Sequence, residues 1–83
     1  MAVNQRLATS RIDIKLIALD REILALLLEG RCTPGYLAEE TGEQQPWVSQ
    51  RLSRLVDAAI VEKVHRGLYE LADEYRTEVA ADE

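Results

Sequence analysis

The 83-residue sequence has no phenylalanine, one histidine, one cysteine and only two lysines. The single cysteine, Cys32, excludes an internal disulfide, so we expect a cytoplasmic protein in which Cys32 is a small core residue, with a reactive thiol as the alternative. Neither a run of about 18 apolar residues nor a signal-peptide pattern is present, so we expect no contact with membranes. The chain also lacks a glycine-rich phosphate loop, metal-ligand spacing and a paired nucleophile and base. We therefore predict that it is not an enzyme and that it binds no cofactor, metal or small-molecule ligand.

Charge is unevenly distributed along the chain. The net charge of −5 argues at first sight against a nucleic-acid partner. Residues 44–67 are nevertheless locally basic: the cations are Arg51, Arg54, Lys63 and Arg66, and the acids are Asp57 and Glu62. The scarcity of lysine beside abundant acid resembles proteins of salt-loving, or halophilic, archaea, although an ordinary small acidic protein fits the same composition.

The length allows one domain, which should bury somewhat more than about 60% of its unfolded surface. We expect residues 1–9 to be a flexible segment and residues 10–83 to form the domain. Apolar residues at spacings of three and four predict an N-terminal helix over about 11–29. The rival interpretation is a strand over 11–19, where apolar residues also alternate, followed by a shorter helix that Asp20 caps.

Two short helices joined by a tight turn are predicted next. A Thr-Pro pair with Thr33 as the N-cap predicts a helix over 34–41. Gly42 follows and is suited to a left-handed backbone conformation. Gln44, as the next N-cap, opens a helix over 45–58. The apolar stripe of this helix is Val48, Leu52 and Leu55.

A hairpin completes the pattern. β-branched, aliphatic and aromatic residues over 60–71 flank a His-Arg-Gly turn. Asp73 is expected to cap a final helix over 74–80. This order of elements predicts a mainly α fold with a small β-hairpin, the winged helix-turn-helix, in which the helix over 45–58 is the recognition helix and the hairpin is the wing.

Residues 37–71, LAEETGEQQPWVSQRLSRLVDAAIVEKVHRGLYEL, resemble the winged-helix core of MarR- and ArsR-type regulators. They are similar in particular to small haloarchaeal regulators of the phage phi-H repressor type. The resemblance implies a transcriptional regulator, a repressor, that binds double-stranded DNA with the recognition helix in the major groove and the wing on the minor groove or the backbone. One departure is Ala59, where such proteins usually have glycine. If this position needs a positive φ, alanine costs about 1 kcal/mol.

The outward side of the recognition helix carries the first candidate DNA contacts. Gln50 can pair with adenine through its amide, or it is a solvated surface residue. Gln45 has a similar claim to base reading, with a phosphate contact as the alternative because it lies nearer the start of the helix. Ser49 and Ser53 suit phosphate contacts. Trp47 is a candidate for packing on a thymine methyl group or on a sugar, and sealing the core beside the wing is the alternative.

Charged residues extend this candidate surface. Arg54 suits a phosphate or a guanine, whereas Arg51 lies nearer the apolar stripe and is expected to pair with an acid such as Glu62. At the hairpin tip, Arg66 suits the minor groove or a phosphate, and His65 adds a charge when protonated below about pH 6.5. The full set of predicted DNA-binding residues is Gln45, Trp47, Ser49, Gln50, Ser53, Arg54, His65 and Arg66.

A homodimer is predicted, because two recognition helices spaced by about 34–36 Å match one turn of DNA. We expect the N-terminal helix, together with the helix over 74–80, to form the interface through Ile12, Leu16, Leu19 and Ile23. The alternative is that this apolar face packs within one chain. The alternative function is a winged-helix module that binds a protein, as an adaptor or antirepressor, and does not bind DNA.

Overall fold

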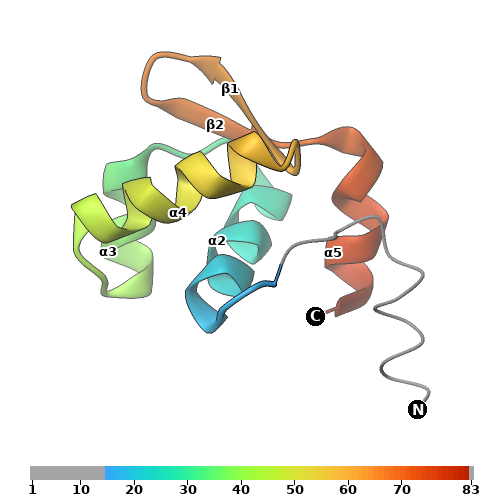
Figure 1. Ribbon diagram of the computed structural model, residues 1–83, viewed down its shortest axis with the longest axis horizontal. Helices are drawn as coiled ribbons and strands as arrows, with labels where there is room; N and C mark the ends of the chain where they lie inside the picture. The colour runs from blue at the N-terminus through green and yellow to red at the C-terminus, as the bar shows by residue number, and fades with distance from the viewer. Residues whose placement is uncertain (1–14, 83) are drawn as a thin grey trace.

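Figure 1 shows the computed structural model, which describes residues 15–82. Its elements are α2 (Ala18–Glu29), α3 (Pro34–Thr41), α4 (Gln45–Asp57), the strands β1 (Val61–His65) and β2 (Leu68–Leu71), the short 3-10 helix η1 (Asp73–Tyr75) and α5 (Arg76–Asp82). Helices α3 and α4 pack together over α2, the hairpin extends beside α4, and α5 packs on α2. The predicted fold class is confirmed: the described chain is mainly helical, with one two-stranded antiparallel hairpin in the order of a winged helix-turn-helix. The predicted flexible segment, residues 1–9, lies outside the described residues.

Helix α2 begins at Ala18, later than the predicted start near residue 11. Residues 15–17 are not helical, and residues 11–14 lie outside the described part. The backbone N–H of Ile17 donates a hydrogen bond to Oδ2 of Asp20 at 3.0 Å. Asp20 is thus the third residue of the helix and not its N-cap, and its carboxylate satisfies a backbone donor where the helix begins. The observed helix is closer to the shorter of the two sequence interpretations.

The turn between α3 and α4 follows the sequence signals. Oγ1 of Thr33 accepts a hydrogen bond from the backbone N–H of Tyr36 at 3.1 Å, so the predicted N-cap is confirmed. Gly42 has φ of +77°, and its N–H donates to the carbonyl of Ala38 at 2.9 Å. This left-handed end is the conformation that glycine adopts without steric cost. Gln44 holds the N-cap position of α4, although its side chain makes no capping hydrogen bond.

Helix α4 ends at Asp57, one residue before the predicted end, in a turn closed by two backbone hydrogen bonds. The N–H of Ile60 donates to the carbonyl of Leu55 at 3.0 Å, and the N–H of Ala59 donates to the carbonyl of Val56 at 2.9 Å. These two bonds form a Schellman motif, whose left-handed residue is usually glycine. Here that residue is Ala59, with φ of +63°. Ala59 therefore has the positive φ on which the expected cost of alanine at this position depends.

The hairpin has a bulge near its tip. The register shifts between Lys63 and His65, which leaves Val64 as the extra residue on β1. Next to the bulge, the backbone of Tyr69, which pairs with Lys63, exchanges two hydrogen bonds with Cys32, at 3.0 and 2.9 Å. This pairing attaches β2 to the link between α2 and α3.

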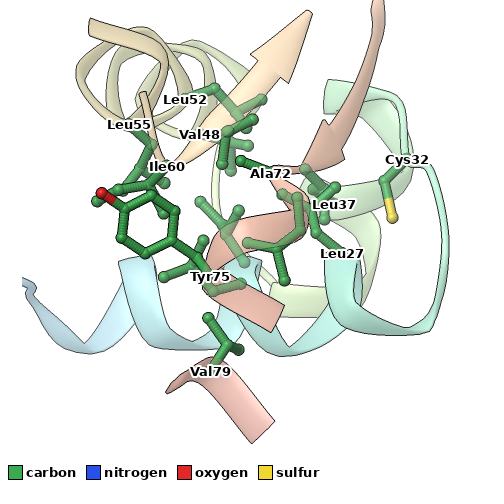
Figure 2. Packing of buried hydrophobic residues seen from close by; sticks show 14 of the residues in the cluster. Leu27, Cys32, Leu37, Val48, Leu52, Leu55, Ile60, Ala72, Tyr75 and Val79 are labelled. Atoms are coloured by element: carbon green, nitrogen blue, oxygen red, sulfur yellow. The ribbon is translucent and has the colours of Figure 1, made fainter. Parts of the chain in front are cut away.

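An aliphatic core holds these elements together, as Figure 2 shows. The apolar side chains that are at most 1% exposed are Ile23, Leu27, Leu37, Val48, Leu52, Leu55, Ile60, Val61 and Leu71. Tyr75 and Val79, from the C-terminal segment, pack into the same cluster. Leu19 and Ile23, which the sequence assigned to a dimer interface, are buried in this core and are reassigned to it, because α5 and the other helices of the same chain cover that face of α2.

The C-terminal segment differs from the predicted helix over 74–80 at its start. Ala72 is the N-cap of η1, so Asp73 lies in the first turn and does not cap it. Oδ1 of Asp73 accepts a hydrogen bond from Nε of Arg76 at 3.2 Å, and Nη1 of Arg76 donates to the carbonyl of Leu28 at 3.2 Å. The second bond attaches α5 to the end of α2. Within residues 15–82, no helix is long and apolar enough to cross a membrane.

Candidate nucleic-acid interface

Helix α4 has one buried face and one exposed face. The three residues of its predicted apolar stripe are fully buried: Val48, Leu52 and Leu55. The predicted contact residues on this helix are exposed, apart from Ser49, which is half-buried: Gln45, Trp47, Gln50, Ser53 and Arg54. Figure 1 shows that α4 crosses over α2, with the hairpin beside it. Its outer surface therefore offers amides, hydroxyls, a guanidinium and an indole to an approaching partner.

Two of the predicted cations have no acidic partner in the part of the chain that the structure describes. Arg54 lies on the exposed face of α4, and Arg66 lies in the turn of the hairpin. The salt bridges of residues 15–82 involve other arginines: Arg31–Glu70, Arg51–Asp20 and Arg76–Asp73. The charges of Arg54 and Arg66 are thus available to an external anion.

The hairpin tip is exposed. His65 ends β1, Arg66 and Gly67 form the turn, and both His65 and Arg66 are open to solvent. Gly67 has φ of +69°, a conformation that favours glycine at this position. The bulge at Val64 lies directly before these residues. The wing therefore ends in an exposed guanidinium beside an exposed imidazole.

The partner of Arg51 is not the one expected from the sequence. Nε and Nη2 of Arg51 donate to Oδ1 and Oδ2 of Asp20 at 2.8 and 2.7 Å. Asp20 is 0% exposed and the Arg51 side chain is 15% exposed. The prediction that Arg51 pairs with an acid is therefore confirmed, but the acid is Asp20 and not Glu62. The hydrogen bond to Asp20 raises the pKa of Arg51, which burial alone would lower.

Trp47 does not seal the core. The residue is 38% exposed, and the Cζ atom of Arg51 lies 5.6 Å from the centroid of its ring. This distance is within the range of a cation–π interaction. Trp47 and Arg51 are four residues apart on one helix, and side chains at this spacing are neighbours on the helix surface. The contact could therefore have been predicted from the sequence.

Other chemistry has little support among the described residues. Cys32 is a core residue, as expected: it is 5% exposed, and its Sγ donates to the carbonyl of Gly30 at 3.4 Å. Burial, followed by the nearby charge of Glu29, raises the pKa of this thiol, which keeps it protonated and unreactive. Within residues 15–82, no group of three or more His, Cys, Asp and Glu side chains is arranged to hold a metal ion. A shallow depression on α4 belongs to the interface itself; its lining residues are Gln50, Arg51, Ser53, Arg54, Asp57 and Ala58.

Comparison with solved structures finds the same fold in several proteins. ZitR of Lactococcus lactis is 21% identical, with a TM-score of 0.72 over 96% of this chain and 65% of that chain. A homodimeric winged helix-turn-helix DNA-binding domain of Mycobacterium bovis, described as a possible ArsR-family transcriptional regulator, is 25% identical, with a TM-score of 0.73 over 98% of this chain and 78% of that one. The adhesin competence repressor AdcR of Streptococcus pyogenes is 26% identical, with a TM-score of 0.68 over 98% and 63% of the two chains.

The sequence itself matches a family. A comparison with curated proteins finds no significant match. This chain spans slightly less than two thirds of the ZitR and AdcR chains. Residues 21–63 match the family of bacterial regulatory proteins named arsR. The matched residues are more than half of the chain and include α3, α4 and the start of the wing. The chain therefore belongs to the arsR family of bacterial regulatory proteins.

Proposed function

We propose that the chain is a transcriptional regulator, a repressor, that binds double-stranded DNA sequence-specifically as a homodimer. The observation that carries this proposal is the exposed face of α4 with Arg54, together with Arg66 at the hairpin tip, neither of which has an acidic partner among residues 15–82. Family membership and the likeness to the DNA-binding domain of Mycobacterium bovis support it. We infer that α4 lies in the major groove and the wing lies on the minor groove or the backbone.

The proposed DNA contacts on α4 divide into a residue that reads bases and residues that contact phosphates. Gln50 is the proposed base reader, because an amide that pairs with adenine at two atoms contributes about 1–3 kcal/mol of discrimination. Gln45, Ser49 and Ser53 are proposed phosphate contacts, which set orientation and carry no sequence information. Arg66 is proposed to enter the minor groove or hold a phosphate, with His65 as a neighbouring DNA contact.

Binding to the DNA upstream of its own gene tests the proposal. Fluorescence anisotropy of labelled DNA, measured over a salt series, should give an affinity that falls as salt rises. Arg54→Ala and Arg66→Ala should each weaken binding, and each should reduce the slope of log affinity against log salt by about 1. Arg21→Ala removes the same charge from the exposed surface of α2 and should bind as the wild type does. If neither Arg54→Ala nor Arg66→Ala changes binding, the protein-binding adaptor is the better function.

The proposed dimer needs a surface other than Leu19 and Ile23. Leu16 is half-buried, and Ile12 lies outside the described residues. We propose that Ile12, Leu16 and the outer side of α5 form the interface; the homodimeric state of the Mycobacterium bovis domain supports a dimer. Sedimentation velocity at tens of micromolar protein in high salt should give a dimer, which Leu16→Asp weakens. A wild-type monomer under these conditions would remove the dimer from the proposal.

We also propose a narrower place for the chain, among MarR-like and haloarchaeal regulators of the phi-H repressor type, acting in the cytoplasm. The support is compositional: only two of the ten basic residues are lysines, and acids are in excess. A protein adapted to a saline cytoplasm should melt at a higher temperature in molar KCl than in dilute buffer. Equal melting temperatures in the two solutions would contradict the halophilic origin.

A further inference from the structure

Asp20 binds Arg51 in a way that leaves the guanidinium little freedom. The carboxylate accepts three hydrogen bonds: Oδ1 from Nε of Arg51, and Oδ2 from Nη2 of Arg51 and from the backbone N–H of Ile17. Two parallel bonds between a carboxylate and a guanidinium hold both groups close to one plane. Because Asp20 is fully buried and also fixes the start of α2, the carboxylate itself is held in place. The plane of the Arg51 guanidinium is thus set by a contact between α2 and α4.

Arg51 in turn supports an aromatic ring on the candidate interface. Trp47 lies one helical turn before Arg51, and its ring centroid is 5.6 Å from the Cζ atom. Trp47 is the single tryptophan of the sequence, and it is 38% exposed instead of being packed in the core. Trp47 is the third residue of α4, and the first residues of a recognition helix are those that contact base edges. One side of the indole is therefore supported by Arg51 at the end of the helix where bases are read.

We propose that Asp20 and Arg51 are positioning residues, which hold Trp47 so that its indole packs on an apolar edge of the DNA. This inference rests on the proposed DNA-binding function. A thymine methyl group or the sugar edge is the chemistry that such a ring contacts. An indole that a neighbouring guanidinium already holds through a cation–π contact loses less rotational freedom on binding than a mobile one, so the ion pair increases affinity without touching DNA. The charge of Arg51 is compensated by Asp20, so Arg51 is not a phosphate contact.

The positioning role is tested first on the free protein. Trp47 is the single tryptophan, so its emission anisotropy and its quenching by acrylamide report on this side chain alone. The double variant Asp20→Leu with Arg51→Met replaces the pair by apolar groups, an exchange that often preserves stability. Arg51→Lys keeps the charge but loses the planar fork and the stacking surface. With circular dichroism confirming the fold, both variants should lower the anisotropy and increase quenching. Unchanged values in a folded variant would overturn the positioning role.

The DNA contact is tested by affinity and base preference. Trp47→Ala and the double variant should each weaken binding on the order of tenfold, and both should relax the preference at the same base pair. Neither should alter the salt dependence, since no phosphate contact is lost, whereas Arg54→Ala should reduce it.

The outcomes separate this inference from the proposed function. If Arg54→Ala weakens binding while Trp47→Ala and the double variant bind as the wild type does, the inference is wrong and the DNA-binding function stands. If the double variant reduces the salt slope as Arg54→Ala does, Arg51 is a phosphate contact, and the positioning role is wrong. If the wild type binds no DNA at any salt concentration, the proposed function fails and the contact made by Trp47 fails with it.

Discussion

Ala59 is the residue whose replacement tests the end of α4 most simply. It has φ of +63° in a Schellman motif, and its side chain is exposed, so the methyl group adds no buried contact that offsets the strain. A residue with a Cβ atom costs about 1–2 kcal/mol in this left-handed conformation. Glycine avoids that cost but loses about 0.5–1 kcal/mol more backbone entropy on folding than alanine does. We therefore expect Ala59→Gly to raise the free energy of unfolding by about 0.5–1 kcal/mol.

Calorimetry or a thermal melt followed by circular dichroism measures this effect. In domains of about 60–100 residues, 1 kcal/mol corresponds to a shift in melting temperature of about 4–8 °C, so Ala59→Gly should raise it by about 2–8 °C. The matched control is Ala80→Gly, at an exposed position in the regular helix α5, which should lower the melting temperature. A fall for Ala59→Gly as well would refute the left-handed conformation at this residue.

Three further predictions concern stability and the thiol. Asp20→Ala leaves the Arg51 guanidinium without its buried partner, so it should lower the free energy of unfolding, measured by urea denaturation, by about 3–5 kcal/mol. The control Glu22→Ala, on the exposed side of α2, should change it by less than about 0.5 kcal/mol. Thr33→Ala removes the N-cap acceptor of α3 and should cost about 1 kcal/mol; an unchanged urea midpoint would contradict the cap. Burial raises the pKa of Cys32 in the folded protein, so the thiol of the unfolded chain loses its proton at a lower pH. The contribution of the protonated thiol to the free energy of unfolding is therefore complete below the ordinary thiol pKa. It is lost as the pH rises through the raised pKa of the folded protein. A thiol reagent should label Cys32 slowly in buffer and rapidly in urea, and equal rates would show that the thiol is not buried.

The helix-turn-helix could be predicted from the sequence because its boundaries depend on residues within it. Thr33 caps α3 through a hydrogen bond to a backbone N–H three residues away, and Gly42 ends the same helix by a conformation that its own lack of a side chain permits. The condition on Ala59 was also local, since it depended only on the backbone at the end of one helix. Such signals are contained in a few neighbouring residues, so one sequence suffices to interpret them.

The partner of Arg51 could not be predicted in this way. It is Asp20, which meets Arg51 across 31 positions of the sequence. The start of α2 depends instead on a local hydrogen bond between Ile17 and Asp20, and the shorter of the two sequence interpretations came close to it. Glu62 is nearer in the sequence, but only the packing of α2 against α4 decides which acid Arg51 reaches. The apolar pattern through Leu19 and Ile23 correctly indicates a buried face. It does not reveal whether α5 of the same chain or a second chain covers that face.

Backbone amide chemical shifts, followed by NMR during titration with the upstream DNA, test most directly whether the exposed face of α4 and the hairpin tip form the binding surface. We predict that the largest changes occur at Gln50, Ser53, Arg54 and Arg66, the exposed residues proposed to meet the grooves and phosphates. Changes confined to the exposed acidic residues of α3, Glu39 and Glu40, or an absence of changes at saturating DNA, would contradict a DNA interface on α4.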